Sequence, residues 1–448
     1  MPLRGLILTA IFVASLPVCF LRPFYGIWLW TIVSFLNPQE YTWSAATAIP
    51  WAVLVAVPTL AGMFIFHTQE WGRLRSRETF LIVVLWIWFT FTSLISTHTP
   101  LFMHHATDTW FRWNEVSKIL LMSLAMVIIV NDFRKLRVLL LTIAGSFGVF
   151  VAKTFPFIIA SGGQFRVYGP PNSMIADNND FGLALDMTLP LFFFLAQSET
   201  KPWVKRLFGF LFLITIPAIL FTYSRGALLG LLILSALMIV RLKQRLPVIA
   251  VVVIGLLVGL MFAPEAWRHR MDPTRDDAID ASAKSRIVAW TFAYNLASDY
   301  PVTGGGFGTF TQELFSRYGP VVDVHAAHSI YFQVLGEHGY TGLLLYLTLA
   351  AVCLIASSRL LSQASARNDV TVGLYANMLR FSIVGFLIPG FFLARAYFDY
   401  YFAIVACLAI LRRVAAERWA EEDAEAEQAV EEESGGCEPF AAETALGT

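Results

Sequence analysis

The chain has 448 residues, of which 57% are hydrophobic and 14% are charged. Soluble domains are about 45–50% apolar and about 25% charged, so this composition excludes an ordinary water-soluble fold and indicates a protein dissolved in lipid. The formal net charge is zero, which excludes the strongly basic surface typical of nucleic-acid binding. We therefore expect an integral membrane protein in contact with membrane lipid, with no nucleic-acid partner.

Apolar runs recur from the first residues to about position 412. A run of about 20 residues crosses a bilayer core as a helix. The sequence therefore predicts an all-α, polytopic membrane domain over residues 1–412, with about 12 transmembrane helices and a range of about 11 to 13. In chain order the runs lie near 5–21, 25–37, 45–66, 79–97, 116–130, 138–160, 180–197, 207–222, 226–240, 247–263, 329–357, 372–393 and 396–411.

The first 37 residues leave the number of crossings open. Residues 5–21 imitate a secretory signal, but further spans follow at once and we expect the segment to be retained. The run 25–37 follows Arg22-Pro23 and is short for a span. We expect twelve spans with both termini inside, so that this region contributes one crossing plus a broken or re-entrant piece. Thirteen spans with an outward N-terminus is the alternative.

Orientation follows from Lys and Arg, which collect in short cytoplasmic loops. Five loops that fall on one side of alternating spans carry such clusters, whereas the alternate loops and the long loop 264–327 carry fewer basic residues in proportion. We therefore expect loop 264–327 to be extracytoplasmic. Residues 413–448 are Glu- and Ala-rich and predict an acidic cytoplasmic tail, partly helical or disordered. The clusters are Arg73, Arg75 and Arg77; Arg134, Lys135 and Arg137; Lys201, Lys205 and Arg206; Arg241, Lys243 and Arg245; and Arg359 and Arg367.

The turn Thr222-Tyr223-Ser224-Arg225-Gly226 lies between two apolar runs on the side with less positive charge. One interpretation is an arginine that snorkels to the interface and caps the preceding helix. The other is a fixed cation for an anionic headgroup, because a guanidinium binds phosphate oxygens in a bidentate way.

Loop 264–327 is too long for a passive connection between packed spans. Residues 285–294 form an amphipathic stretch in which Ile287, Trp290 and Tyr294 share one face of a helix suited to the membrane surface. Arg286 at its start is either a solvated charge or a second part of a phosphate clamp with Arg225.

Glycines and histidines end the same loop. The run Gly304-Gly305-Gly306-Phe307-Gly308 is either a flexible turn or a place where the backbone approaches a ligand closely. His325 and His328 have the spacing HxxH, but no Cys or carboxylate cluster supplies further zinc ligands, so we expect no metal and no cofactor. His328 is either a polar residue at a helix start or a general base toward a hydroxyl.

The stretch from His328 resembles the O-antigen ligase and polymerase superfamily. Its ligases carry a histidine, then Asn, Ser or Gln, nine variable residues, glycine, two variable residues, and Gly, Thr or Tyr. His328, Ser329, Gly339 and Gly342 fit this pattern. The turn with Ser224 and Arg225, Arg286 before an apolar helix, and the segment with Gly304, Gly306 and Gly308 also look like motifs of that family, in its order.

The N-terminal half resembles the putative O-glycosylation ligases associated with exosortase A systems, through Arg22-Pro23-Phe24, Asn37-Pro38 and the run 176–180. The resemblance implies a metal-independent enzyme of the bacterial inner membrane whose active site faces the periplasm. It would transfer a glycan from a polyprenyl diphosphate carrier to a lipid, glycan or protein acceptor. Carried over to this chain, Arg225 and Arg286 would hold the diphosphate and His328 would serve the acceptor hydroxyl.

Three other functions remain open at this point. A polymerase of the same superfamily would use a second carrier-linked glycan as acceptor, although Ser329 after His328 favours a ligase. A transporter or flippase of the lipid-linked glycan should show internal repeats with broken helices near the midplane, and no such repeat is evident. A purely structural scaffold would leave the long loop and its polar residues unexplained.

Overall fold

The structure is a computed structural model that describes residues 3–435 apart from 43–46, 48, 67, 242–244, 262, 266, 269–275 and 322. Within these residues the chain forms helices and no strand, as expected for a chain whose backbone polar groups must be satisfied inside a bilayer. Seven helices are long and apolar enough to cross a membrane, and three shorter apolar helices accompany them. The protein is an all-α polytopic membrane protein, as predicted, and the number of crossings stays a prediction.

The helices in chain order, with short 3₁₀ segments marked η, are α1 (Leu3–Leu21), α2 (Pro23–Leu36), η1 (Pro38–Tyr41), α3 (Trp51–Phe66), η3 (Thr68–Leu74), α4 (Arg77–His98), η4 (Met103–His105), α5 (Ala106–Ile129), α6 (Phe133–Ala160), α7 (Asn178–Ser198), α8 (Pro202–Leu220), α9 (Arg225–Arg241), α10 (Arg245–Met261), α12 (Asp276–Asp299), α13 (Gln312–Tyr318), α14 (Ile330–Ala366), α15 (Val370–Leu387), η5 (Pro389–Phe392) and α16 (Asp399–Gly435). Lys243 of the predicted basic loops and Cys437 of the tail lie outside the described residues.

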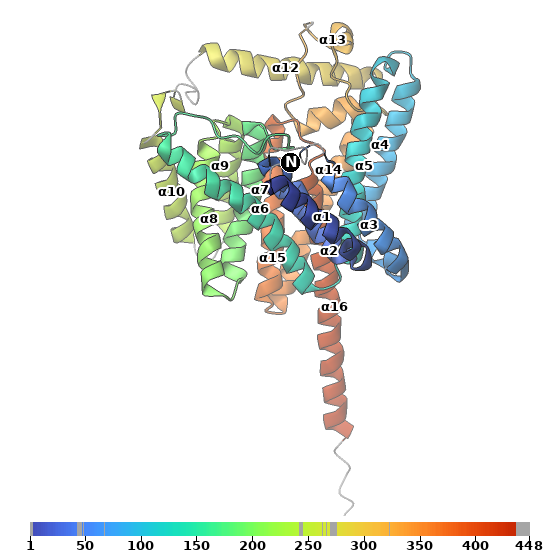
Figure 1. Cartoon of the computed structure of the whole chain (residues 1–448), viewed down its shortest axis with the longest axis vertical. Coiled ribbons are helices and arrows are strands. Elements are labelled where there is room, and N and C mark those ends of the chain that lie inside the picture. Colours follow the sequence, from blue (N-terminus) through green and yellow to red (C-terminus); the bar gives the residue numbers. More distant parts are fainter. Residues whose placement is uncertain are drawn as a thin grey trace, which may run out of the picture.

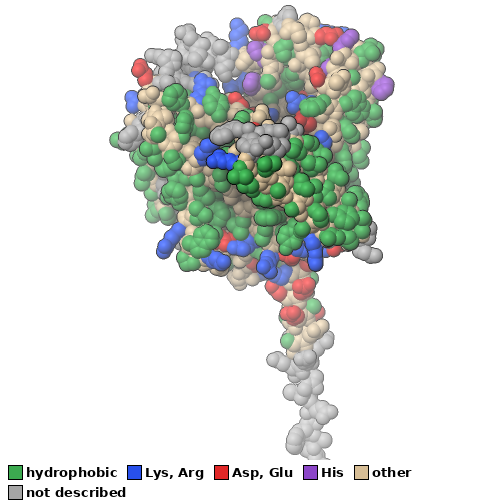
Figure 2. All heavy atoms as spheres, in the orientation of Figure 1, with side chains coloured by type: hydrophobic (Ala, Val, Ile, Leu, Met, Phe, Trp, Pro, Cys, Tyr) green, Lys and Arg blue, Asp and Glu red, His purple; other side chains and the backbone are tan. Residues whose placement is uncertain are grey.

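The bundle has two distinct ends. Helix α12 lies across one end, which we call the α12 end, and α16 protrudes from the opposite end (Figure 1). Hydrophobic side chains cover a broad band of the surface, and Lys and Arg side chains gather at the border where α16 leaves the bundle (Figure 2). Three basic residues lie there, of which Arg73 belongs to a predicted cluster. Arg73 and Arg413 donate to carbonyls at the end of α5, and Arg412 forms an ion pair with Glu78.

Residues 3–36 form two helices, α1 and α2, and the chain reverses between them at Arg22. Only α1 is long enough to be a candidate span, and α2 is a shorter apolar helix, so the number of crossings in this region stays a prediction. Phe20 contacts Phe66 at the end of α3, whereas Phe35 near the end of α2 contacts Tyr400 at the start of α16. Pro23 explains the sharp restart, because its fixed φ suits the first position of a helix and it disfavours helical geometry in the residue before it.

The predicted tail begins inside a helix. Helix α16 runs without interruption from Asp399 to Gly435, so residues 413–435 are helical. Arg367 forms an ion pair with Asp423 at 2.7 Å, and Arg418 pairs with Asp369. These contacts tie the base of the protruding helix to the α14–α15 connection.

A small second core covers the α12 end. Val288, Phe292 and Leu296 face one side of α12 and pack with Phe315 of α13, which is the spacing of a buried helical stripe. Ile287 and Tyr294 are exposed on α12, but the intervening Trp290 stacks on Phe332 of α14 with ring centroids 4.9 Å apart. Ile287 and Tyr294 are therefore exposed on the surface, as predicted, whereas Trp290 packs against the protein.

Candidate active site

The turn before α9 holds Arg225 in a fixed position. Tyr223 adopts a left-handed conformation with φ 59°, and its hydroxyl donates a hydrogen bond to the carbonyl of Gly163 at 2.7 Å. The Ser224 hydroxyl accepts a hydrogen bond from the amide of Ala227 at 3.2 Å, which caps the first turn of α9. Arg225 is thus the first residue of a helix that begins on a rigid turn.

Arg286 of α12 lies close to this turn. Its guanidinium is 5.9 Å from the ring centre of Phe392. Its buried Nε atom has no hydrogen-bond partner, and no described carboxylate forms an ion pair with it. Burial and the positive charge of Arg225 both lower the pKa of Arg286. Two neighbouring cations, one of them without an acidic partner among the described residues, favour an anionic ligand.

His328 lies beside Arg286. It has a left-handed backbone with φ 44°, which side chains other than glycine rarely adopt. Burial lowers the pKa of the imidazole, and the charges of Arg286 and His325 lower it further, whereas the carboxylate of Asp177 raises it. The histidine is therefore held neutral near pH 7, as a proton acceptor must be.

The glycine segment is hydrogen-bonded to α14, the helix that follows His328. Gly304, Gly306 and Gly308 all have positive φ, between 61° and 83°. The amide of Gly305 donates to the carbonyl of Gly336 at 2.9 Å, and the amide of Gly306 donates to the carbonyl of residue 337 at 2.8 Å. Because these amides are bonded to α14, the segment is not a free turn, and Phe307 and Gly308 line the cavity described below.

The remaining motif residues shape the start of α14. Gly339 has φ 69° and ψ −172°, which breaks the helical geometry and is a conformation open essentially to glycine. Gly342 packs against the side chains of His338 and Trp88. Ser329 stands before the first residue of α14, is fully buried, and its hydroxyl has no partner among the described residues.

The structure adds residues that the sequence analysis did not assign to the site. Arg395 forms an ion pair with Asp180 at 2.6 Å. Asn178 donates from its side chain to the carbonyl of Thr222 at 2.7 Å. The polar residues at the start of α7 therefore hold both the Arg225 turn and the segment after η5. Several polar residues directly before an apolar run were the sequence feature that could have indicated this role.

A cavity of about 560 Å³ adjoins this site. Its lining includes Ala326 and Ala327, which directly precede His328, and also Glu337 and Tyr397. The Tyr397 hydroxyl donates to the Glu337 carboxylate at 2.5 Å. Its size falls within the range of about 300–1,000 Å³ typical of small-molecule sites. We call it the larger cavity.

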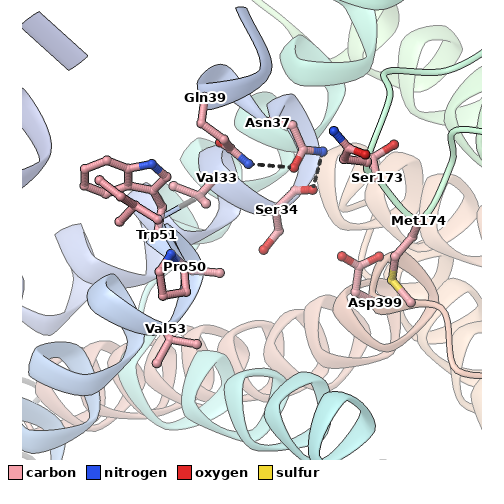
Figure 3. A pocket seen from close by; sticks show the side chains of 13 residues that line it. Val33, Ser34, Asn37, Gln39, Pro50, Trp51, Val53, Ser173, Met174 and Asp399 are labelled. Atoms are coloured by element: carbon pink, nitrogen blue, oxygen red, sulfur yellow. Dashed lines mark hydrogen bonds between the residues drawn. The ribbon is translucent and has the colours of Figure 1, made fainter. Parts of the chain in front are cut away.

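A smaller cavity of about 270 Å³ lies next to it, and Met174 lines both. Figure 3 shows Asp399 and Met174 on one wall and Trp51 on the opposite wall. Asn37 donates from its side chain to the carbonyl of Ser34. Its described lining contains one acid and no base.

Metal binding finds no support in the geometry of the described residues, where no three His, Cys, Asp or Glu side chains are grouped to hold an ion. Asp323 lies 3.6 Å from His325. Cys19, Cys353 and Cys407 are buried and unpaired.

Fold and site together define a polytopic α-helical membrane protein with a cationic, histidine-containing site at one end of its bundle. Residues 210–347 match the family model described as O-antigen ligase, so this part of the chain is similar to the O-antigen ligases. Residues 3–200 match a family of unknown function, DUF5935. Among curated proteins none matches the chain. The match to residues 210–347 supports a ligase-type or polymerase-type enzyme that acts on lipid-linked glycans, and the matched region contains Arg225, Arg286 and the motif from His328 to Gly342.

Proposed function

We propose that the protein is an O-glycosylation ligase that transfers a glycan from a polyprenyl diphosphate carrier to an acceptor hydroxyl. The reaction would take place at the outer face of the bacterial inner membrane, with the α12 end toward the periplasm. The observation that carries this proposal is the proximity of Arg225, Arg286 and His328 at one end of the bundle, two cations next to a half-buried neutral imidazole.

In the proposed reaction, the acceptor oxygen attacks the anomeric carbon of the sugar attached to the diphosphate. The carbon–oxygen bond to the diphosphate breaks, and its electron pair leaves with the polyprenyl diphosphate. The hydroxyl proton passes to His328. All atoms of the donor are thus divided between the new glycoside and the released lipid diphosphate.

Arg225 and Arg286 would hold the diphosphate before and during bond cleavage. Negative charge grows on the leaving group in the transition state, and fixed cations in a site of low dielectric stabilise that charge best. Arg225 begins a helix, so the amides of the first turn and the helix dipole add to its attraction for an anion.

His328 would act as the base. Its lowered pKa keeps it unprotonated in the resting site. When the diphosphate neutralises Arg286, the repulsion between the arginine and a protonated imidazole weakens, so the histidine becomes a stronger base only after the donor has bound. The proposed chemistry uses side chains alone, and we propose that it needs no divalent metal or cofactor.

Purified protein in lipid nanodiscs tests this proposal. Radiolabelled polyprenyl diphosphate glycan is the donor, and the acceptor is an extract of membranes from a strain that lacks this protein. We expect label in a glycoconjugate and release of unlabelled polyprenyl diphosphate. Label in a longer lipid-linked glycan would instead identify a polymerase, and intact donor with no transfer would contradict the proposal.

A further inference from the structure

The larger cavity carries an inference that rests on the proposed function and concerns the second substrate. Glu337 is a buried acid in its wall. Three donors face its carboxylate: the Tyr397 hydroxyl, the Gly308 amide at 3.2 Å and the Gln333 side chain. A carboxylate offers about four lone-pair sites, so one acceptor position remains for a ligand hydroxyl.

The charges of the larger cavity differ in sign from those of the arginine site. Three acids and two arginines line it: Asp108, Glu115 and Glu337 with Arg112 and Arg395. Both arginines already have acidic partners, since Arg112 bonds Glu115 at 3.2 Å and Arg395 bonds Asp180. An anionic diphosphate therefore finds no cation in this cavity that lacks an acidic partner, whereas a neutral ligand rich in hydroxyls finds carboxylate acceptors.

Apolar rings complete the cavity. Phe307, Phe310 and Tyr397 line it beside Glu337, and ligand sites commonly combine aromatic walls with a few fixed polar groups. A purely apolar ligand such as a lipid chain would cover the Glu337 carboxylate without bonding to it, which is costly. A sugar has both the flat C–H surface for the rings and the hydroxyls for the acid.

The position of the cavity relative to His328 indicates that the cavity binds the acceptor and not the donor. Ala326 and Ala327 line the cavity, and the next residue is the histidine beside Arg286. In a direct displacement at an anomeric carbon, the nucleophile approaches from the face opposite the leaving group. With the diphosphate at Arg225 and Arg286, the cavity is the compartment from which a hydroxyl would approach.

We propose that the larger cavity binds the acceptor through a sugar residue, and that Glu337 is a specificity-determining residue that accepts a hydrogen bond from one of its hydroxyls. Further sugars would extend past Met174 into the smaller cavity, whose side-chain amides, hydroxyls and single acid (Figure 3) suit a neutral glycan. The acceptor is thus a glycan-bearing molecule.

Filling the cavity is the first test, because it removes no polar contact. Ala326 is exposed and lines the cavity, so Ala326→Trp should fold normally and occupy ligand space. The matched control is Ala160→Trp, an exposed alanine at the end of α6 that does not line either cavity. The membrane extract from the strain lacking the protein is the acceptor, titrated at saturating donor, and donor affinity is measured separately by binding of labelled polyprenyl diphosphate glycan.

We expect the KM for the acceptor extract to rise at least about tenfold in Ala326→Trp, with donor affinity and the Ala160→Trp control unchanged. Glu337→Gln should also raise this KM by about tenfold, the effect of losing about one hydrogen bond, while donor affinity stays the same. Preference among acceptors treated to remove terminal sugars should change in Glu337→Gln, which a merely structural role would not cause.

An unchanged acceptor KM in Ala326→Trp would overturn the inference and leave the proposed function intact. A rise in the Kd for the donor instead would assign the cavity to the donor glycan and also overturn it. Transfer by the wild type to a peptide that carries no sugar, at the same KM as to the extract, would exclude glycan recognition. Absence of donor binding and transfer in the wild type would contradict the proposed function itself.

Discussion

The indole of Trp290 donates a hydrogen bond from Nε1 to the carbonyl oxygen of Ala327, over 3.0 Å. Trp290 lies one turn after Arg286 on α12, and Ala327 directly precedes His328. One hydrogen bond therefore joins the helix that carries Arg286, proposed to bind the diphosphate, to the segment that carries His328, the proposed base.

Trp290→Phe should keep the aromatic contact with Phe332 and lose this hydrogen bond. We expect kcat to fall about 10- to 100-fold, because small misplacements of reacting groups have effects of this size, with thermal stability nearly unchanged. Trp86→Phe is the matched control, since Trp86 donates an equivalent bond to Ser117 away from the site. Equal losses in both variants would show that the Trp290 bond has no special part in catalysis.

Arg225→Ala and Arg286→Ala should each abolish measurable transfer while the protein remains inserted and folded. Lys substitutions should rescue only in part, because an ammonium keeps the charge but loses the planar fork that matches phosphate oxygens. Binding of labelled donor and size-exclusion profiles measure the two effects. Arg317→Ala, an exposed arginine at the same end of the molecule, should behave as wild type, and near-normal transfer by both site variants would favour the snorkelling interpretation.

His328→Ala should reduce transfer by about 10²–10⁴-fold, the usual loss for a positioned base, while donor affinity survives. Activity of the wild type should persist in excess chelator. Loss of activity with EDTA and its recovery with added metal would contradict metal independence and return attention to the HxxH spacing of His325 and His328.

The pH dependence follows from the lowered pKa of His328. A protonated imidazole cannot accept the hydroxyl proton, so kcat/KM should fall as pH decreases through a midpoint below about 6.5, the ordinary histidine value. Asp177 raises the pKa of His328, so Asp177→Asn should move the midpoint to lower pH, and asparagine still suits a helix cap. Glu313→Gln serves as control, and a shift of the midpoint to higher pH would contradict the assignment.

Topology reporters test the orientation. Fusions after Arg75, Lys135, Lys205, Lys243 and Ser362 should report the cytoplasm, and fusions near Asn172 and Asp280 should report the outside. A cytoplasmic signal at Asp280 would place Arg286 on the wrong face for a periplasmic ligase. A fusion at the N-terminus would also separate twelve crossings from thirteen.

The sequence was sufficient to predict a helical membrane protein and to select Arg225, Arg286 and His328, because charged and titratable residues next to apolar runs are conspicuous. The structure brings these three together, and their roles stay predictions. The ion pair between Arg395 and Asp180 was not predictable, because its partners are far apart in the chain and each alone looks like an ordinary interfacial charge. The hydrogen bonds from the glycine segment to α14 were missed for the same reason, since backbone partners leave no trace in residue type.

The bonds from Gly305 and Gly306 to carbonyls of α14 have a consequence for biogenesis. During synthesis the glycine segment emerges before the carbonyls it needs, while Ser96 and Thr109, which also bond this segment, are already in the membrane. N-terminal parts of a chain generally fold first during synthesis, but here the glycine segment must wait for α14 to be inserted. Docking of the glycine segment and positioning of His328, just before α14, therefore occur in one late step. A nascent chain that stalls before α14 has both arginines but no assembled site.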